Sequence, residues 1–331
     1  MNKICQLLGT NYPIVHEPIH TLTDGKLVAA ISESGALGIL GINAGYKVRS
    51  DATSSASISN SNKIGTISNN SLLDAMTERN LMNEQIDQTL SNTFRPFGVE
   101  IASSLSSPED DHRATELVEL MRKRRLTIAL FEGFGKVASR KWINLLHNSG
   151  IKIMQIINNI NDIRVAQSNG IDILICKSNT DLANFVHQAG KTPVLAGYDT
   201  TDSHVLKDAL AKGAQGVFLK TVFALAKEAP TSPIIKDKVI NAQKQELISF
   251  KINSQTIYSL PGKLPQKLAK LTQDNEDGKQ IFTAANGYQG LINGMAKGDL
   301  EMGYTDIAAD SYNIKTIKTV HEIIAELTNN N

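Results

Sequence analysis

Cysteine is scarce in this chain, and so are the long apolar runs that would carry it into a membrane. The 331 residues include two cysteines, Cys5 and Cys176. Two thiols are too few for a disulfide framework or a zinc site, and such low use is typical of a reducing compartment. No apolar run is long enough to span a bilayer, and no signal peptide is evident. We therefore expect a cytoplasmic protein with no membrane partner and no metal site.

The chain also lacks an excess of charge of either sign. Lysine and arginine total 34 and aspartate and glutamate total 33, which gives a formal net charge of +1. A nearly neutral protein has no overall field that would gather nucleic acid around it. The composition thus predicts no nucleic-acid partner.

The most informative stretch is residues 192–221, which read TPVLAGYDTTDSHVLKDALAKGAQGVFLKT. Its two apolar runs, 194–196 and 217–219, lack period-2 alternation, as parallel strands covered on both faces do. An amphipathic helical pattern lies between them. If these are the last two strands of a closed parallel barrel, Gly197 and Thr221 lie at its C-terminal rim, where backbone N–H groups commonly hold a phosphate. A strand–helix–strand crossover without a ligand is the alternative.

The rest of the chain favours a closed barrel. Further short apolar or β-branched runs occupy residues 12–15, 37–40, 97–101, 127–131, 152–157 and 171–176. Helical patterns lie between most of them, at residues 25–34, 71–90, 108–124, 136–148, 160–169 and 180–188. This alternation predicts an α/β fold, a (β/α)8 TIM barrel. The main rival, an open doubly wound sheet, would usually show Gly-x-Gly-x-x-Gly after its first strand, and none occurs there.

Two segments depart from the alternation. Residues 50–71 are rich in serine and asparagine and predict a long loop at the rim. Beyond residue 226 the strand–helix pattern stops, and helical patterns follow at residues 236–246, 263–272 and 288–296. We expect residues 1–226 and 304–331 to form the barrel, and residues 227–303 to form a helical insertion that covers its rim as a lid.

Five motifs, in order along the chain, resemble those of one enzyme family. Residues 7–41 read LLGTNYPIVHEPIHTLTDGKLVAAISESGALGILG, residues 97–100 read FGVE, and residues 150–175 form a strand–helix–strand unit. Residues 213–223 read GAQGVFLKTVF, and residues 297–303 read KGDLEMG. Together they resemble the flavin-dependent barrel enzymes that include nitronate monooxygenases, also called 2-nitropropane dioxygenases, and flavin-type enoyl-acyl-carrier-protein reductases. The likeness covers nearly the full length of the chain.

The resemblance implies an FMN cofactor and assigns its ring contacts to matching positions of this chain. The family's methionine after the first strand corresponds to Ile19, which follows Glu17 and Pro18. The family's asparagine on the third strand becomes Glu100, and its glutamine after the sixth strand becomes Lys177. A cation near the N1–C2=O edge of the ring would stabilise the anionic reduced flavin. Pairing between Glu100 and Lys177 is the alternative.

The resemblance places the FMN phosphate between two rim turns. The family's Ala-Gly-Gly-Ile becomes a turn that contains Gly197 and Tyr198, and its Gly-Thr-Arg-Phe becomes one that contains Lys220 and Thr221. Asp199 follows the first turn, and its charge would repel a phosphate. Lys220 can compensate as a point charge, and Thr221 still offers a hydroxyl and an N–H group.

The family's catalytic histidine has no counterpart at its expected place. That histidine lies in a glycine-rich loop after the sixth strand, whereas here the strand runs into CKSNTDL and a helix. His16 and His20 follow the first strand; His16, with Lys177, is the candidate for the proton-transfer group, and hydrogen bonding of His16 within its loop is the alternative. Without the usual histidine, the resemblance implies a flavin that NADH or NADPH can reduce and slow turnover of the family's substrates.

Two functions therefore stay open at this point. One is an FMN-dependent oxidoreductase of the nitronate monooxygenase or enoyl reductase type, acting on a small molecule or an acyl thioester. The other is a catalytically degenerate barrel that binds flavin or a phosphorylated ligand and acts as a sensing or scaffold protein. Either protein could be a homodimer.

Overall fold

A closed barrel of parallel strands forms the body of the molecule. The computed structural model describes residues 2–46, 74–177, 181–252 and 255–329; the loop predicted at residues 50–71 lies outside them. One sheet has the strand order β1-β8-β7-β6-β5-β4-β3-β2. A parallel bridge joins Val15 of β1 to Leu37, just before β2, and the Leu37 N–H donates to the Ile14 carbonyl at 2.9 Å. The two edges of the sheet thus meet, which confirms the predicted (β/α)8 TIM barrel.

The barrel strands are short, and their bounds lie close to the predicted runs. They are β1 (Ile14–His16), β2 (Ile39–Leu40), β3 (Gly98–Ala102), β4 (Ile128–Glu132), β5 (Lys152–Ile156), β6 (Ile173–Lys177), β7 (Val194–Tyr198) and β8 (Gly216–Leu219).

Helices surround these strands, and short polar side chains fix where several of them begin. Asp24, Asp111, Ser139 and Asp181 each accept a hydrogen bond from a backbone N–H group in the first turn of the helix that follows. The outer helices are α2 (Gly25–Glu33), α3 (Ala75–Leu90), α4 (His112–Lys123), α5 (Arg140–Asn148), α6 (Ile163–Asn169), α7 (Leu182–Ala189), α8 (Val205–Ala211) and α9 (Thr221–Ala224).

Apolar side chains fill the barrel on both sides of its wall. Alternate strand residues such as Val15, Leu195 and Phe218 point inward and form a fully buried cluster. Helix α1 (Lys3–Leu8) closes the N-terminal end of the barrel, because Ile4 and Leu8 belong to the same cluster. The intervening strand residues pack outward against the helices in a second, larger cluster. The C-terminal mouth is left for a site, as expected of this fold.

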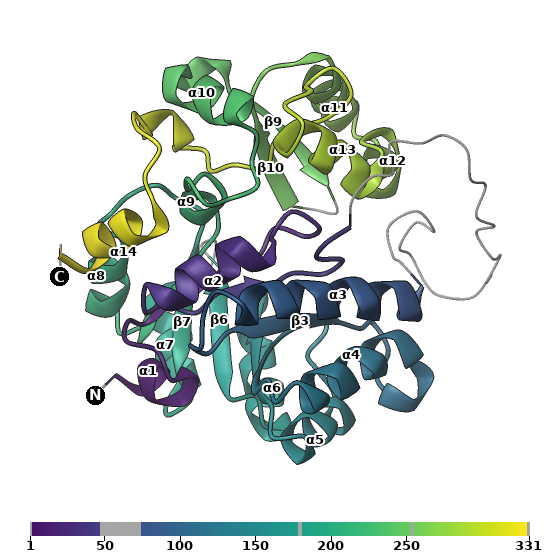
Figure 1. The fold of residues 1–331 in the computed structure, drawn as a ribbon, viewed down its shortest axis with the longest axis vertical. Coiled ribbons are helices and arrows are strands. Elements are labelled where there is room, and N and C mark those ends of the chain that lie inside the picture. The colour runs from purple at the N-terminus through teal and green to yellow at the C-terminus, as the bar shows by residue number, and fades with distance from the viewer. Residues whose placement is uncertain (1, 47–73, 178–180, 253–254, 330–331) are drawn as a thin grey trace.

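A separate layer lies over the barrel, as Figure 1 shows. It consists of α10 (Pro233–Asn241), β9 (Ile248–Ile252), β10 (Gln255–Ser259), α11 (Lys263–Gln273), α12 (Gly278–Ala284) and α13 (Gly287–Met295). Helices α10, α11 and α13 were expected, but α12 and the antiparallel hairpin β9–β10 were not. We call these elements the cap; the predicted division at residues 227–303 stays a prediction. Its own apolar cluster includes Ile19 and Leu22, which come from the loop after β1.

The chain then returns to the barrel wall. Helix α14 (Val320–Asn329) contacts α2, α8 and α9. Among the described residues, no helix has both the length and the apolar character needed to cross a bilayer.

Candidate functional site

The barrel mouth is lined by charged side chains whose positions follow from strand alternation. The inward residues deep in the barrel are mostly apolar, and the next inward position lies two residues later. That step leads from Val15 to Glu17, from Leu130 to Glu132, from Ile175 to Lys177, from Leu195 to Gly197 and from Phe218 to Lys220. On β3 it leads from Gly98 to Glu100. Carboxylates and ammonium groups from separate strands therefore converge at one end of the barrel.

Glu17 and Lys177 form an ion pair across this mouth. The Lys177 ammonium donates to Glu17 Oε1 and also lies 5.8 Å from the centroid of the Phe218 ring. Among the described residues, the other Glu17 oxygen, Oε2, is buried and has no hydrogen-bond partner. The predicted pairing of Lys177 with Glu100 does not form, because Lys177 pairs with Glu17 instead. An unsatisfied buried carboxylate oxygen beside a lysine is a point at which a ligand can bind.

A second polar cluster joins the barrel to the cap. His20 Nε2 lies 3.3 Å from Glu100 Oε1, and His20 Nδ1 lies 3.0 Å from the hydroxyl oxygen of Tyr288 on α13. The backbone N–H of Ile42 donates to the other Glu100 oxygen at 3.0 Å. The His20 side chain is 28% exposed while that of Glu100 is 5% exposed. The imidazole is therefore accessible, and the groups that orient it are buried.

The charges around His20 favour its protonated form. Burial alone would lower its pKa, but Tyr288, Glu100 and Glu132 outweigh that cost and hold the pKa of His20 well above its ordinary value. Glu132 shows the opposite environment, since burial and the nearby Glu100 charge raise the pKa of its carboxyl. A protonated imidazole beside carboxylates can donate a proton and cannot act as a base.

His16, the candidate proton-transfer residue, lies elsewhere. Its side chain is 1% exposed, its Nδ1 accepts from the Ile39 N–H at 3.4 Å, and its ring meets that of Phe223 edge-on. Burial lowers the pKa of His16 to about 3, so the ring is neutral. His16 is thus the last residue of β1, and it hydrogen-bonds to β2 and not within the loop expected for it.

In the loop after β1, the backbone groups of Ile19 form hydrogen bonds within the loop itself. The Ile19 N–H donates to Thr23 Oγ at 2.9 Å, and the Ile19 carbonyl accepts from Thr23 N–H at 3.0 Å. Ile19 itself packs into the cap cluster, and Pro18 is buried. These residues shape the wall of the mouth, and the Ile19 N–H and carbonyl are already engaged.

At the predicted phosphate end, the donors converge on a carboxylate of the chain itself. The N–H and the hydroxyl of Thr221 donate to Asp199 Oδ1 at 3.3 and 2.5 Å. Lys220 Nζ lies 3.0 Å from Asp199 Oδ2 and 2.6 Å from Oδ1 of Asp306, which follows the cap. Gly197 faces the mouth, whereas Tyr198 packs outward against the barrel–helix cluster.

These donors are of the kind that binds a phosphate, but in this structure Asp199 already takes them. An N–H, a hydroxyl and an ammonium group already surround one anionic group, the Asp199 carboxylate, which stands where an oxyanion would be bound. Across the mouth, the buried Oε2 atom of Glu17 has no hydrogen-bond partner among the described residues and can accept a hydrogen bond from a ligand. Sequence reasoning found most of these residues but missed Tyr288 and Asp306. Both come from segments remote from the barrel strands, and no local pattern marks them.

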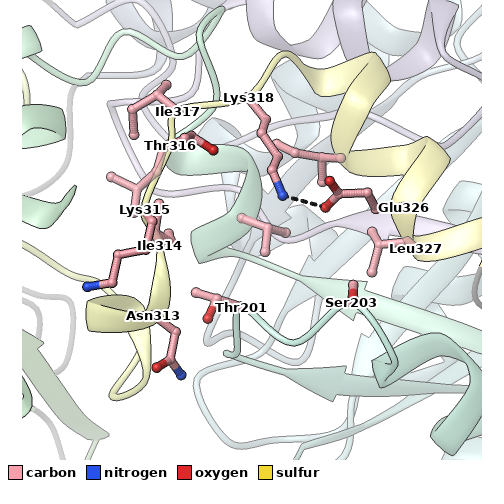
Figure 2. A pocket seen from close by; sticks show the side chains of 13 residues that line it. Thr201, Ser203, Asn313, Ile314, Lys315, Thr316, Ile317, Lys318, Glu326 and Leu327 are labelled. Carbon is pink, nitrogen blue, oxygen red and sulfur yellow. Dashed lines mark hydrogen bonds and ion pairs between the residues drawn. The ribbon is translucent and has the colours of Figure 1, made fainter.

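A pocket of about 240 Å³ lies apart from the mouth, on the barrel wall (Figure 2). It is bounded by residues 313–318 and by Glu326 and Leu327 of α14, and Lys318 pairs with Glu326 beside it at 2.6 Å. Thr201 and Ser203 form its other side. None of the inward mouth residues lines it, so it is not part of the candidate site.

The comparisons with known proteins agree with the fold. A family model described as nitronate monooxygenase matches residues 2–330. A probable nitronate monooxygenase of Staphylococcus aureus is 20% identical over 276 residues, which cover 76% of this chain and 75% of that protein.

Two solved structures share the fold. FabK from Thermotoga maritima has a TM-score of 0.75 at 20% identity, and the alignment covers 100% of this chain and 96% of the FabK chain. Nitroalkane oxidase from Streptomyces ansochromogenes has a TM-score of 0.70 at 15% identity, with 98% and 97% of the two chains covered. The match of the family model over almost every residue settles the assignment: this chain belongs to the nitronate monooxygenase family.

Proposed function

We propose that this protein is an FMN-dependent oxidoreductase that works in the reductive direction, on a small molecule or acyl thioester with an electron-poor double bond. Membership of the family supports the redox chemistry. The observation that carries the direction is the position of the His20 imidazole at the barrel mouth, 3.3 Å from the Glu100 carboxylate, a contact that favours the protonated ring. Reduction of such a double bond needs an acid for the protonated carbon, whereas oxidation of a nitroalkane begins with a base.

The residues of the mouth have separate tasks in this proposal. FMN, when bound, would be the hydride carrier between NADH or NADPH and the substrate. Lys177 places a positive charge beside the ring site, and Thr221 and Lys220 offer donors to the phosphate. His20 holds the proton on the face of the mouth that the cap covers, and Tyr288 and Glu100 orient its ring.

The proposal also accounts for the missing loop histidine. In a family member without that residue, the proton has to come from another element. His20 lies on the loop after β1 and meets α13 of the cap, so the acid comes from a different strand end than that of β6. Proton donation by a positioned side chain is typically worth about 10²–10⁴-fold in rate.

Anaerobic half-reactions separate the two steps. We expect NADH or NADPH to bleach the visible absorbance of FMN added to the protein, and a crotonyl thioester to restore it. His20→Gln should leave the first step unchanged and slow the second by about 10²-fold or more. In the natural protein, the rate of the second step should also fall in alkaline solution, because His20 loses its proton. That decline in rate should be absent from His20→Gln.

His187→Gln is the matched control, because His187 is exposed on α7 and lies outside the mouth. It should behave as the natural protein does in both steps. Equal slowing of both steps by His20→Gln would argue for a structural role of His20. Bleaching without any reoxidation would favour the degenerate flavin-binding barrel.

A further inference from the structure

We propose that Asp199 occupies the place of the flavin phosphate, so that this protein holds FMN no more tightly than riboflavin. The inference rests on the proposed function, since it concerns the same FMN site. It makes Asp199 the residue that decides how much the phosphate adds to the affinity for the cofactor.

The contacts of Asp199 use the donors of Thr221 and Lys220 that were assigned to the phosphate. Thr221 gives it both its N–H, at 3.3 Å, and its hydroxyl, at 2.5 Å. Lys220 Nζ completes the set at 3.0 Å from the second oxygen. A carboxylate and a phosphate present similar anionic oxygens to such donors, so the two compete for one set of hydrogen bonds.

The charge balance also opposes a phosphate. Lys220 is shared between two carboxylates, because Asp306 lies at 2.6 Å on its other side. The Lys220 side chain is 14% exposed, so these charges are only partly screened by water. One ammonium between two carboxylates leaves a net negative charge, and a phosphate monoester would add about two more at neutral pH. The phosphate can enter only if Asp199 turns away.

Covalent attachment favours Asp199 in this competition. Asp199 directly follows β7, whose last residue is Tyr198, so its carboxylate is held beside Thr221 by the barrel wall itself. A tethered group acts at an effective concentration of about millimolar or more, whereas free FMN must bind from dilute solution. FMN therefore gains little from its phosphate in the natural protein.

The ratio of two affinities tests this directly. We would measure binding of FMN and of riboflavin, which lacks the phosphate, by equilibrium dialysis and flavin fluorescence. In the natural protein the two dissociation constants should agree within about threefold, a difference of under 1 kcal/mol. In Asp199→Ala, FMN should bind at least about tenfold more tightly than riboflavin, because the donors become free and a like charge is removed. Asp199→Asn, which keeps the shape, should shift the ratio in the same direction.

Asp202→Ala is the control, since it removes the same charge from an exposed position in the same loop. Its ratio should match that of the natural protein. A natural protein that already prefers FMN tenfold, or an Asp199→Ala ratio that stays at one, would overturn the inference and leave the proposed function standing. Failure of all variants to bind either flavin would overturn both.

Discussion

Two histidines four positions apart in the sequence have opposite protonation states, and the difference comes from their neighbours. His16 is buried beside Phe223 and a backbone amide, with no carboxylate hydrogen-bonded to it, so burial lowers its pKa to about 3. His20 is also desolvated, but the hydroxyl of Tyr288 and the Glu100 carboxylate outweigh that effect. Residue type alone therefore predicts neither state; the contacts of each ring do.

His16 should make the protein sensitive to mild acid. Its folded pKa of about 3 lies below the ordinary value of 6.5, so its contribution to stability is complete above pH 6.5 and is lost as the pH falls toward 3. Between pH 6.5 and 5 this loss amounts to about 2 kcal/mol, at 1.36 kcal/mol per pH unit. His16→Leu should remove that part of the pH dependence, measured as the free energy of unfolding in urea at pH 7 and pH 5. An unchanged difference between the two pH values would mean that His16 is not buried as a neutral ring.

The residues of the mouth could be predicted only where they end a strand. Glu17, Glu132 and Lys177 end continuously buried runs, and each lies two residues beyond a side chain that points into the barrel. The partners of these residues could not be predicted in the same way. Tyr288 reaches His20 across 268 positions and Asp306 reaches Lys220 across 86, and such contacts depend on how the cap docks.

At the scale of elements, the barrel was predictable because its strands are short apolar runs and its outer helices lie between them. The cap was predictable only in part. The hairpin β9–β10 was missed although its buried residues Phe250, Ile252 and Ile257 alternate with exposed ones. That pattern is short, and it follows a helical pattern that had been extended to residue 246. The structure ends that helix, α10, at Asn241.

Helix α13 reaches the mouth because one glycine allows it to lie against the chain that follows. A Cβ on Gly294 would approach the backbone of Tyr304 within 2.0 Å, so the helix would have to shift. We expect Gly294→Ala to destabilise the protein by about 1–3 kcal/mol and to slow flavin reoxidation, because Tyr288 would be displaced from His20. Thermal unfolding and the half-reaction assay measure the two effects. Gln280→Ala, at an exposed position of the neighbouring helix α12, should change neither.

At the scale of the whole molecule, the barrel and the cap have separate apolar clusters joined by few residues. The cap cluster includes Leu22 from the loop after β1 and Leu225 from the end of α9, both of which belong to the barrel part of the chain. Polar contacts add His20 with Tyr288 and Lys220 with Asp306. These are the same residues that form the candidate site, so docking of the cap and completion of the site are one event.

That coupling predicts how the molecule opens. Leu22 is 6% exposed, and Leu22→Ala should remove about 2–5 kcal/mol of packing where the cap meets the barrel. Because the barrel keeps its own interior cluster, backbone amides of α11 and α13 should exchange with deuterium faster while those of β4 and β6 stay protected. Leu130→Ala, inside the barrel, is the matched control and should accelerate exchange in strands and cap together, since it weakens the part on which the cap is built. Equal acceleration everywhere in Leu22→Ala would mean that barrel and cap unfold as one unit.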